Sequence, residues 1–352
     1  MQKNLSRIKY LIKEISEISK KNKKKTAFLI GNTSKFNNKK FYLTPIREFN
    51  KIILFGAIIY NEKIALQISK IVDGKVDYVF VDSEKKIKKS NIHIGDAANI
   101  ERTVRENISK SNLMTYKGND LTVEALDLLI SNRSRNEIKG LGSKKISILG
   151  AGNLGSKIAL KLVERGAKVL IYRRNLKKLR LLTKALNIIK PDSTEQKISY
   201  SNNIYKVVKN ADVIIGSTDG IPIIDKKMLL NSKKNVFVVD VGKGTVKKEA
   251  IKYAIEKNIT IFRLDITAAL AGMIESNIYF NNLLEKSIGY RVINGQKIVS
   301  GGLLAEENDV VVDNINNPKK IYGLSDGMGD IKISISRKDN QRIKKIKLFF
   351  KI

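Results

Sequence analysis

The sequence predicts an α/β fold with parallel sheets, because short apolar runs alternate with amphipathic helical segments along most of the chain. Hydrophobic residues make up 42% of the 352 residues, which is enough for the cores of two compact domains. We expect an α/β domain over residues 1–130, a second domain with a parallel sheet over 131–275, and a strand-containing C-terminal extension over 276–352.

The first domain is expected to begin with an amphipathic helix over residues 1–22, in which leucine and isoleucine recur at helical spacing. The same periodicity arguments predict strands at 26–30, 52–59 and 78–81 and helices at 61–72, 96–108 and 123–130. Asp96 is a suitable N-cap for the helix that follows a polar, lysine-rich loop. The polar segment 131–135 is expected to link the two domains.

A glycine-rich turn follows the first strand of the second domain, within residues 145–155. Gly150 permits a tight turn, Gly152 lets backbone amides approach a pyrophosphate, and Gly155 lets the next helix pack closely against the strand. The helix N-terminus then favours negative charge. The candidate cofactor contacts in this turn are Gly150, Ala151, Gly152, Asn153, Leu154 and Gly155.

The segments on both sides of this turn complete a βαβ unit, which predicts a Rossmann-type dinucleotide-binding domain. Residues 156–165 form an amphipathic helix pattern, and residues 168–172 form a second apolar strand. Arg173 and Arg174 follow that strand, where an NAD-dependent enzyme usually has an acidic residue for the ribose 2′-OH. Because guanidinium groups bind phosphate in bidentate fashion, we favour NADP over NAD as the cofactor.

The remaining pattern continues in the same style. Strands are expected at 211–216, 235–241 and 260–264, and helices at 176–186 and 245–257. Thr218, Asp219 and Gly242 follow two of these strands, so they are expected at the carboxyl edge of the sheet beside the cofactor. In the C-terminal extension only 310–312 and 331–335 resemble strands, and its role is not predicted.

Residue usage excludes several kinds of chemistry. The chain has no cysteine, so thiolate nucleophiles, disulfides and thiolate metal sites are excluded. The only histidine, His93, lies in a polar loop, and no metal site is predicted. Lys, Asp, Asn, Thr, Tyr and a cofactor must therefore supply the chemistry.

The net charge of +33 by itself suggests an anionic partner such as nucleic acid. Lysines are spread over the expected solvent faces, however, and the densest run, residues 20–25, ends a surface helix. We therefore do not expect nucleic acid as the main partner. No apolar run of about eighteen residues is present, and the N-terminus has no apolar signal core, so we expect a cytoplasmic protein without membrane spans.

With these residues in view, the chain resembles the two-domain superfamily that contains shikimate dehydrogenase, methylenetetrahydrofolate dehydrogenase and, more distantly, glutamyl-tRNA reductase. The similarity covers roughly residues 50–275 and rests on the basic loop 172–175, on the strands and loops at 211–218 and 238–242, and on Gly118–Thr122. That last segment lies where the shikimate enzymes carry a Gly-x-Asn-Thr-Asp motif. The resemblance implies an N-terminal α/β substrate domain joined by connecting helices to a Rossmann-type domain, and a homodimer.

The family pattern also implies an aspartate and a lysine in the cleft between the domains. Here Asp120 follows Asn119 directly, no Pro-His-Lys-like segment is present, and Lys117 is the nearest candidate lysine. We expect Lys117 and Asp120 to move the proton, with Asn119 and Thr122 as substrate contacts, because a paired carboxylate orients a lysine and partial burial lowers its pKa. In the alternative interpretation, Asp120 and Thr122 only cap the helix that follows.

The favoured function is an NADP-dependent oxidoreductase that acts on a small polar metabolite, with the charge excess favouring an anionic one. A catalytically inactive NAD(P)-binding regulator or scaffold is the second hypothesis. An RNA- or tRNA-associated reductase is the third, although the absence of cysteine excludes the thioester chemistry of glutamyl-tRNA reductases.

Overall fold

The computed structural model divides the chain into two compact units, Met1–Ala271 and Gly272–Ile352. The predicted α/β fold class with parallel sheets is confirmed, while the division of the first unit into residues 1–130 and 131–275 stays a prediction. His93 and Asp96 lie outside the described residues. The structure describes residues 2–33, 41–87, 89–90, 92, 95, 98–300 and 302–352.

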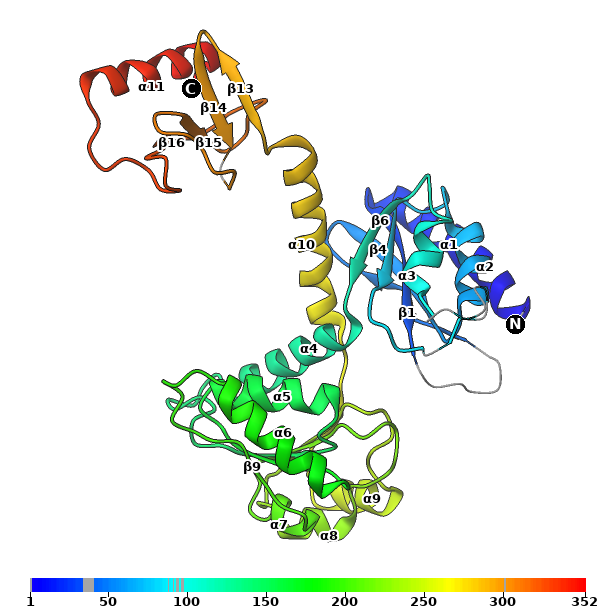
Figure 1. Cartoon of the computed structure of the whole chain (residues 1–352). Coiled ribbons are helices and arrows are strands. Elements are labelled where there is room, and N and C mark those ends of the chain that lie inside the picture. Colours follow the sequence, from blue (N-terminus) through cyan, green and yellow to red (C-terminus); the bar gives the residue numbers. More distant parts are fainter. Residues whose placement is uncertain are drawn as a thin grey trace. The chain divides into compact units, whose positions relative to one another are not determined.

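The first sheet has the order β2-β4-β1-β5-β6, and β3 pairs with β4 (Figure 1). Strands β4, β1, β5 and β6 run parallel, whereas β2 and β3 are antiparallel to β4. Its strands are β1 (Lys25–Asn32), β2 (Tyr42–Leu43), β3 (Arg47–Glu48), β4 (Ile52–Ile59), β5 (Tyr78–Asp82) and β6 (Asn112–Tyr116). Its helices are α1 (Gln2–Asn22), α2 (Glu62–Val72) and α3 (Ile100–Arg105).

Helices α1, α2 and α3 cover one face of this sheet, as the predicted amphipathic patterns require. The apolar stripe of α1, which includes Ile8 and Ile15, is buried against β-strand residues such as Phe28 and Phe55. Asn61 begins α2 because its side chain accepts a hydrogen bond from the Ile64 amide at 2.9 Å. These contacts orient the carboxyl ends of β1, β5 and β6 toward the same edge of the sheet.

The second sheet is entirely parallel in the order β12-β11-β10-β7-β8-β9, which is the Rossmann arrangement. Helices α7, α8 and α9 bury apolar residues against one face, and α5 contacts β7 and β8 (Figure 1). The strands are β7 (Lys145–Leu149), β8 (Lys168–Tyr172), β9 (Ser199–Tyr200), β10 (Val213–Gly216), β11 (Phe237–Asp240) and β12 (Ile261–Arg263). The helices are α5 (Asn153–Glu164), α6 (Leu176–Ile189), α7 (Ile204–Val208), α8 (Lys226–Asn231) and α9 (Lys248–Glu256).

Helix α4 (Gly118–Arg133) differs from the predicted helix over 123–130 at both ends. It begins five residues earlier, so Gly118–Thr122 forms its first turn and not a loop. It also continues into the segment 131–135 that we expected to be a linker. Tertiary contacts set both ends of α4, because the helix follows β6 almost directly and packs along α5.

The second unit holds a four-stranded sheet of order β13-β14-β15-β16, with α11 (Arg337–Phe350) packed on it through Ile346. The strands are β13 (Tyr290–Ile293), β14 (Gln296–Ser300), β15 (Val310–Val312) and β16 (Ile321–Leu324). The strand expected at 310–312 is confirmed as β15. The prediction of a strand at 331–335 is wrong, since in this segment Ile331 forms only an isolated β-bridge with Ser325. Helix α10 (Thr267–Lys286) precedes this sheet.

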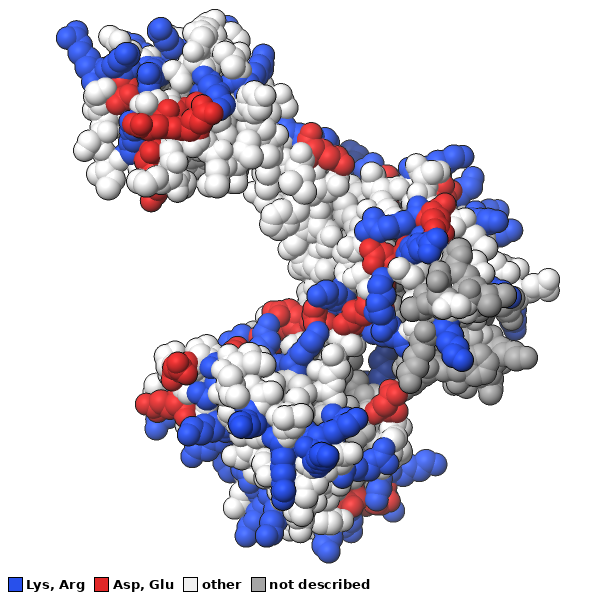
Figure 2. Space-filling view, viewed as in Figure 1, with Lys and Arg blue, Asp and Glu red and all other residues white. Residues whose placement is uncertain are grey.

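Lysine and arginine side chains are spread over the visible face of each unit and are not gathered over a single element (Figure 2). This agrees with the interpretation of the charge as a general property of the surface. Among the described residues, no helix combines the length and the apolar composition that crossing a membrane requires.

Candidate functional site

The glycine turn between β7 and α5 needs glycine at two positions for steric reasons. Gly150 has a φ of +116°, and a Cβ there would lie 2.6 Å from the Thr218 amide nitrogen. A Cβ on Gly155 would lie 2.3 Å from the Gly150 carbonyl oxygen, so only glycine lets α5 start this close to the turn. These contacts produce the close helix–strand packing predicted from the sequence.

Gly152 has a different role, because an added Cβ would meet no atom within 4 Å. The open space lies at the N-terminus of α5, where Gly152 is the N-cap and no side chain caps the helix. The first-turn amides of Asn153, Leu154 and Gly155 are therefore available to an anion, and the helix dipole favours negative charge there. A cofactor pyrophosphate fits this cradle.

Arg173 and Arg174 lie at the end of β8, beside the turn. Arg173 Nη1 donates a hydrogen bond to the Ala151 carbonyl oxygen at 3.0 Å, which places its guanidinium group against the glycine turn. Arg174 is exposed, and Asn175 caps α6 by accepting a hydrogen bond from the Lys178 amide at 2.9 Å. No acidic side chain occupies residues 173–175, so the site offers cations where a 2′-phosphate would lie.

The structure brings Thr218, Asp219 and Gly242 to the same carboxyl edge as the glycine turn. A Cβ on Gly242 would lie 1.8 Å from the Thr218 carbonyl oxygen, so glycine lets the loops after β10 and β11 touch. Thr218 Oγ1 donates to the Ile221 carbonyl oxygen at 2.8 Å, which closes its own loop. The edge formed by these loops is where ligands of open α/β sheets bind.

A cavity of about 470 Å³ opens within the first unit, between the carboxyl edges of its two sheets. Strands of the first sheet contribute polar groups that include Asn32, Asp82 and Tyr116. The segments after β11 and β12 contribute Lys243 and Asp265. The volume suits a small metabolite together with one ring of a cofactor.

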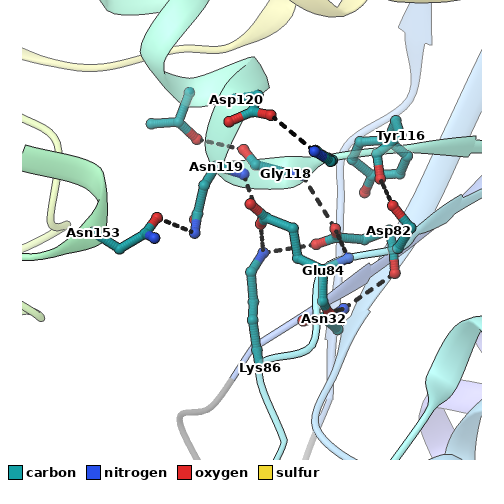
Figure 3. A network of polar contacts seen from close by, with 12 residues as sticks. Asn32, Asp82, Glu84, Lys86, Tyr116, Gly118, Asn119, Asp120 and Asn153 are labelled. Atoms are coloured by element: carbon teal, nitrogen blue, oxygen red, sulfur yellow. Dashed lines mark hydrogen bonds and ion pairs between the residues drawn. The ribbon is translucent and has the colours of Figure 1, made fainter. Parts of the chain in front are cut away.

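Lys86 lines this cavity, and its ammonium group contacts two carboxylates (Figure 3). Its Nζ lies 2.7 Å from Asp82 Oδ2 and 2.8 Å from Glu84 Oε2. The Asp82 side chain is only 2% exposed, and its Oδ1 accepts the Gly118 amide at 3.1 Å. Glu84 Oε2 accepts the Asn119 amide at 2.9 Å. The network therefore ties the loop after β5 to the first turn of α4.

Two further polar groups border the Lys86 network. Asn32 donates from Nδ2 to the carbonyl oxygens of Asp82 at 3.2 Å and Glu84 at 2.8 Å, and its buried Oδ1 has no hydrogen-bond partner among the described residues. Burial, together with the negative charges of Asp82 and Glu84, raises the pKa of Tyr116 well above its usual value. Tyr116 therefore stays protonated at neutral pH and remains a hydrogen-bond donor.

The residues that line the cavity do not include Lys117 and Asp120, and the expected catalytic role of this pair stays a prediction. The Lys117 side chain is 64% exposed and lies 3.9 Å from Asp120 Oδ2. Asp120 forms a closer ion pair with Lys157 of α5. Because α4 begins at Gly118, these two side chains occupy the solvent side and the α5 side of its first turn.

Asn119 and Thr122, by contrast, do line the cavity. Asn119 Nδ2 donates to Asn153 Oδ1 of α5 at 3.4 Å, and Thr122 Oγ1 donates to the Gly118 carbonyl oxygen at 2.9 Å. The second contact lies inside the helix and is not a cap, and no side chain caps α4 at its N-cap residue Lys117, so the capping alternative is wrong for the Thr122 hydroxyl. Its oxygen still has lone pairs that can accept from a ligand.

Sequence reasoning missed Lys86, Asp82 and Asn32, and it had only a weak signal for them. Asp82 ends a buried strand and Lys86 follows four residues later, which places both at a carboxyl edge. In a chain with 67 basic residues, that spacing does not distinguish Lys86 from its neighbours.

With this geometry established, comparison with known proteins gives a direct result for the second sheet. Residues 132–263 match the shikimate / quinate 5-dehydrogenase family. The match confirms the predicted resemblance for the part of the chain that contains the glycine turn, Arg173, Arg174 and the loops after β10 and β11. This region therefore has a Rossmann-type sheet and resembles that family.

Similarity to individual proteins is more limited. A stretch of 99 residues, 28% of this chain, is 30% identical to glutamyl-tRNA reductase of Thermosipho melanesiensis. The match covers 25% of that reductase, so the chain spans about a quarter of the reductase's length. A dipicolinate synthase structure from Bacillus halodurans is 14% identical, with a TM-score of 0.36 over 74% of this chain and 98% of that one. Anabolic ornithine carbamoyltransferase from Campylobacter jejuni is 13% identical, with a TM-score of 0.41 over 80% and 96%.

Proposed function

We propose that the protein is an NADP-dependent oxidoreductase that transfers a hydride between the nicotinamide and a small, polar, anionic metabolite in the cavity between the two sheets. The observation that carries the proposal is the cavity itself. It combines a paired lysine from one sheet with the loop after β11 of the sheet that has the glycine turn. Open α/β sheets bind their ligands at this edge.

The cofactor would be held by the chain's own backbone and cations. The α5 N-terminus and Gly152 would receive the pyrophosphate, and Arg173 and Arg174 would receive the 2′-phosphate. Thr218, Asp219 and Gly242 would border the ribose and nicotinamide. When bound, the cofactor supplies the hydride, and the protein supplies position and a proton.

Lys86 replaces Lys117 in the proposed proton transfer. Its ammonium group donates to Asp82 and Glu84, which leaves its third N–H for a substrate oxygen. In the reduction direction Lys86 would donate this proton to the oxygen of a carbonyl group. In the oxidation direction the neutral amine would accept it from a hydroxyl group. Asn119 and Thr122 would hydrogen-bond the substrate from α4.

The cofactor part of the proposal is tested by titrating the full-length protein with NADPH and NADH and following ligand fluorescence. We expect binding of both, with NADPH at least about tenfold tighter, because a charge-assisted bidentate contact to the 2′-phosphate is absent with NADH. Replacing Arg174 by Ala should remove most of that preference. No binding of either nucleotide would refute the proposal.

The catalytic part is tested with two matched lysine variants once screening of NADPH oxidation with hydroxy and keto acids has identified a substrate. Lys86→Met should lower turnover by about a hundredfold or more, the usual scale for loss of a general acid or base. Lys117→Met makes the same chemical change on an exposed side chain and should leave turnover within about twofold of the unmodified protein. Circular dichroism controls for folding, because Lys86→Met leaves the buried Asp82 without its cation. Equal turnover in the two variants would remove Lys86 from the mechanism.

A further inference from the structure

Two glycines make room for polar groups at the carboxyl edge of the first sheet. A Cβ on Gly118 would lie 2.7 Å from Asp82 Oδ2 and 3.0 Å from Lys86 Nζ, and a Cβ on Gly31 would lie 3.2 Å from the Tyr116 hydroxyl oxygen. Both glycines line the cavity, and neither has a positive φ, so each supplies space and not a special backbone conformation. The Lys86 ammonium group and the Tyr116 hydroxyl group therefore lie where a side chain at either glycine would crowd them.

Both of these groups lie close to Asp82. Asp82 of β5 pairs in register with Tyr116 of β6, and β5 lies between β6 and β1, the strand that carries Gly31. The Tyr116 side chain must therefore cross β5 to bring its hydroxyl group next to Gly31. Lys86 Nζ lies 2.7 Å from Asp82 Oδ2 (Figure 3). A cationic donor and a neutral donor thus lie at the same edge of the sheet, beside the same carboxylate.

The Tyr116 hydroxyl group is a buried hydrogen-bond donor. Tyr116 is only 8% exposed, and it lines the cavity. Its backbone carbonyl oxygen accepts from the Ser83 amide at 2.9 Å, but among the described residues no group accepts from its hydroxyl. An unpaired buried donor is costly, so a ligand that brings an oxygen atom to this hydroxyl is favoured.

We propose that Tyr116 is a second catalytic residue, whose hydroxyl group donates a hydrogen bond to the same substrate oxygen that receives the proton of Lys86. The substrate oxygen belongs to the carbonyl group of a small oxo acid. This inference rests on the proposed function, which supplies the hydride and places the metabolite in the same cavity.

The two donors have different tasks in the reduction. When the hydride adds to the carbonyl carbon, the π electrons of the C=O bond move to the oxygen. Lys86 gives its proton to this oxygen and becomes a neutral amine, so the product is a hydroxy acid. Tyr116 keeps its proton throughout, and its hydrogen bond stabilises the negative charge that develops on the oxygen before the proton arrives.

The kinetics of Tyr116→Phe test the proposal, because this change removes the hydroxyl group and keeps the ring. The probes are pyruvate, acetoacetate and α-ketoglutarate, and their reduction by the full-length protein is followed as NADPH oxidation. For the probe that the unmodified protein reduces fastest, kcat should fall by about a hundredfold, the usual scale for loss of one donor to a developing oxyanion. KM should change by less than about tenfold, because the hydrogen bond is weaker to the uncharged oxygen of the bound substrate.

A binding measurement without turnover gives an independent readout. Oxamate resembles pyruvate but is not reduced, and calorimetry gives its affinity for the protein saturated with NADPH. Tyr116→Phe should weaken oxamate binding by about three- to tenfold, the scale of one hydrogen bond between neutral groups. Tyr78→Phe makes the same chemical change on β5, outside the residues that line the cavity, and should leave kcat and oxamate affinity unchanged.

The double variant Tyr116→Phe with Lys86→Met shows whether the two groups act on one oxygen. Its loss of kcat should be smaller than the product of the two single losses, because groups that act as a unit are not additive. Losses that multiply fully would show that the two donors act independently, and would overturn the inference.

An unchanged kcat in Tyr116→Phe, with or without a higher KM, would also overturn the inference, since the hydroxyl would then contact no reacting oxygen. An equal loss in Tyr78→Phe would overturn it as well, because the effect would not be specific to the cavity. If a probe is reduced equally well by Tyr116→Phe, only this inference fails. If the unmodified protein reduces none of the three probes, this inference fails, and the NADPH titrations and the wider substrate screen decide the proposed function separately.

Discussion

Alanine at Gly152 and at Gly155 should affect different properties, cofactor affinity and stability respectively, although the two glycines are three residues apart in one turn. At Gly155 the new Cβ would lie 2.3 Å from the Gly150 carbonyl oxygen and 2.9 Å from Ser217 Oγ. Ordinary contacts begin near 3.4 Å, so α5 or the turn must move by about 1 Å. Such overpacking typically costs about 1–3 kcal/mol, and we expect the free energy of unfolding of Gly155→Ala to fall by that amount.

At Gly152 the Cβ would meet no atom within 4 Å, and a φ of −96° is allowed for alanine. The free energy of unfolding should therefore change by less than about 0.5 kcal/mol. The methyl group would, however, occupy the space in which the backbone approaches the pyrophosphate. We expect the NADPH dissociation constant of Gly152→Ala to rise by about tenfold or more.

Urea unfolding without cofactor gives the stability of each variant, and NADPH fluorescence titration gives its affinity. Gly272→Ala is a suitable control, because its Cβ also meets nothing within 4 Å and the residue lies in α10, outside the glycine turn. Its NADPH affinity should be unchanged. If Gly152→Ala binds NADPH as tightly as the unmodified protein, the pyrophosphate does not lie at this turn, and our interpretation of the turn is refuted.

Three further predictions follow from other parts of the first unit. Arg165→Met should lower the free energy of unfolding in urea by about 1–3 kcal/mol, because the partly solvated Arg165 binds the buried Asp127 at 2.5 and 2.6 Å. An unchanged midpoint of urea unfolding would show that this ion pair between α5 and α4 does not stabilise the fold. Lys243→Gly should raise the thermal midpoint, since relief of the left-handed φ of +57° is worth about 1 kcal/mol; a lower midpoint would contradict the strain. Burial raises the pKa of Asp77, but hydrogen bonds from Thr26 and Lys25 outweigh it and lower this pKa below its usual value. The ionised carboxylate therefore stabilises the fold above the usual pKa of an aspartate, and this contribution is lost as the pH falls through the lowered pKa. Asp77→Asn should flatten the acid limb of a curve of unfolding free energy against pH, and an unchanged limb would contradict the lowered pKa.

Local sequence determined the glycine turn and the elements on both sides of it. An apolar strand, three glycines and an amphipathic helix specify β7 and α5 through contacts within a dozen residues, so β7, α5 and β8 lie where the pattern predicted them. The same holds for α1, whose apolar stripe has the period of a helix that packs on a sheet. The steric need for glycine at Gly150 and Gly155 is likewise a property of this turn.

Tertiary structure decided which polar side chains meet in the cavity. Lys117 and Asp120 are neighbours in sequence, yet α4 starts at Gly118 and directs them away from the cavity. Lys86 pairs with Asp82 four residues before it, and the first turn of α4 joins them because β5 and β6 are adjacent parallel strands whose carboxyl ends share an edge. The pairing of strands separated by long stretches of chain is set by packing of the whole sheet, and no local pattern encodes it. The sequence by itself therefore determined the glycine turn that we propose binds the nucleotide, and only the assembled sheets decided which lysines line the cavity.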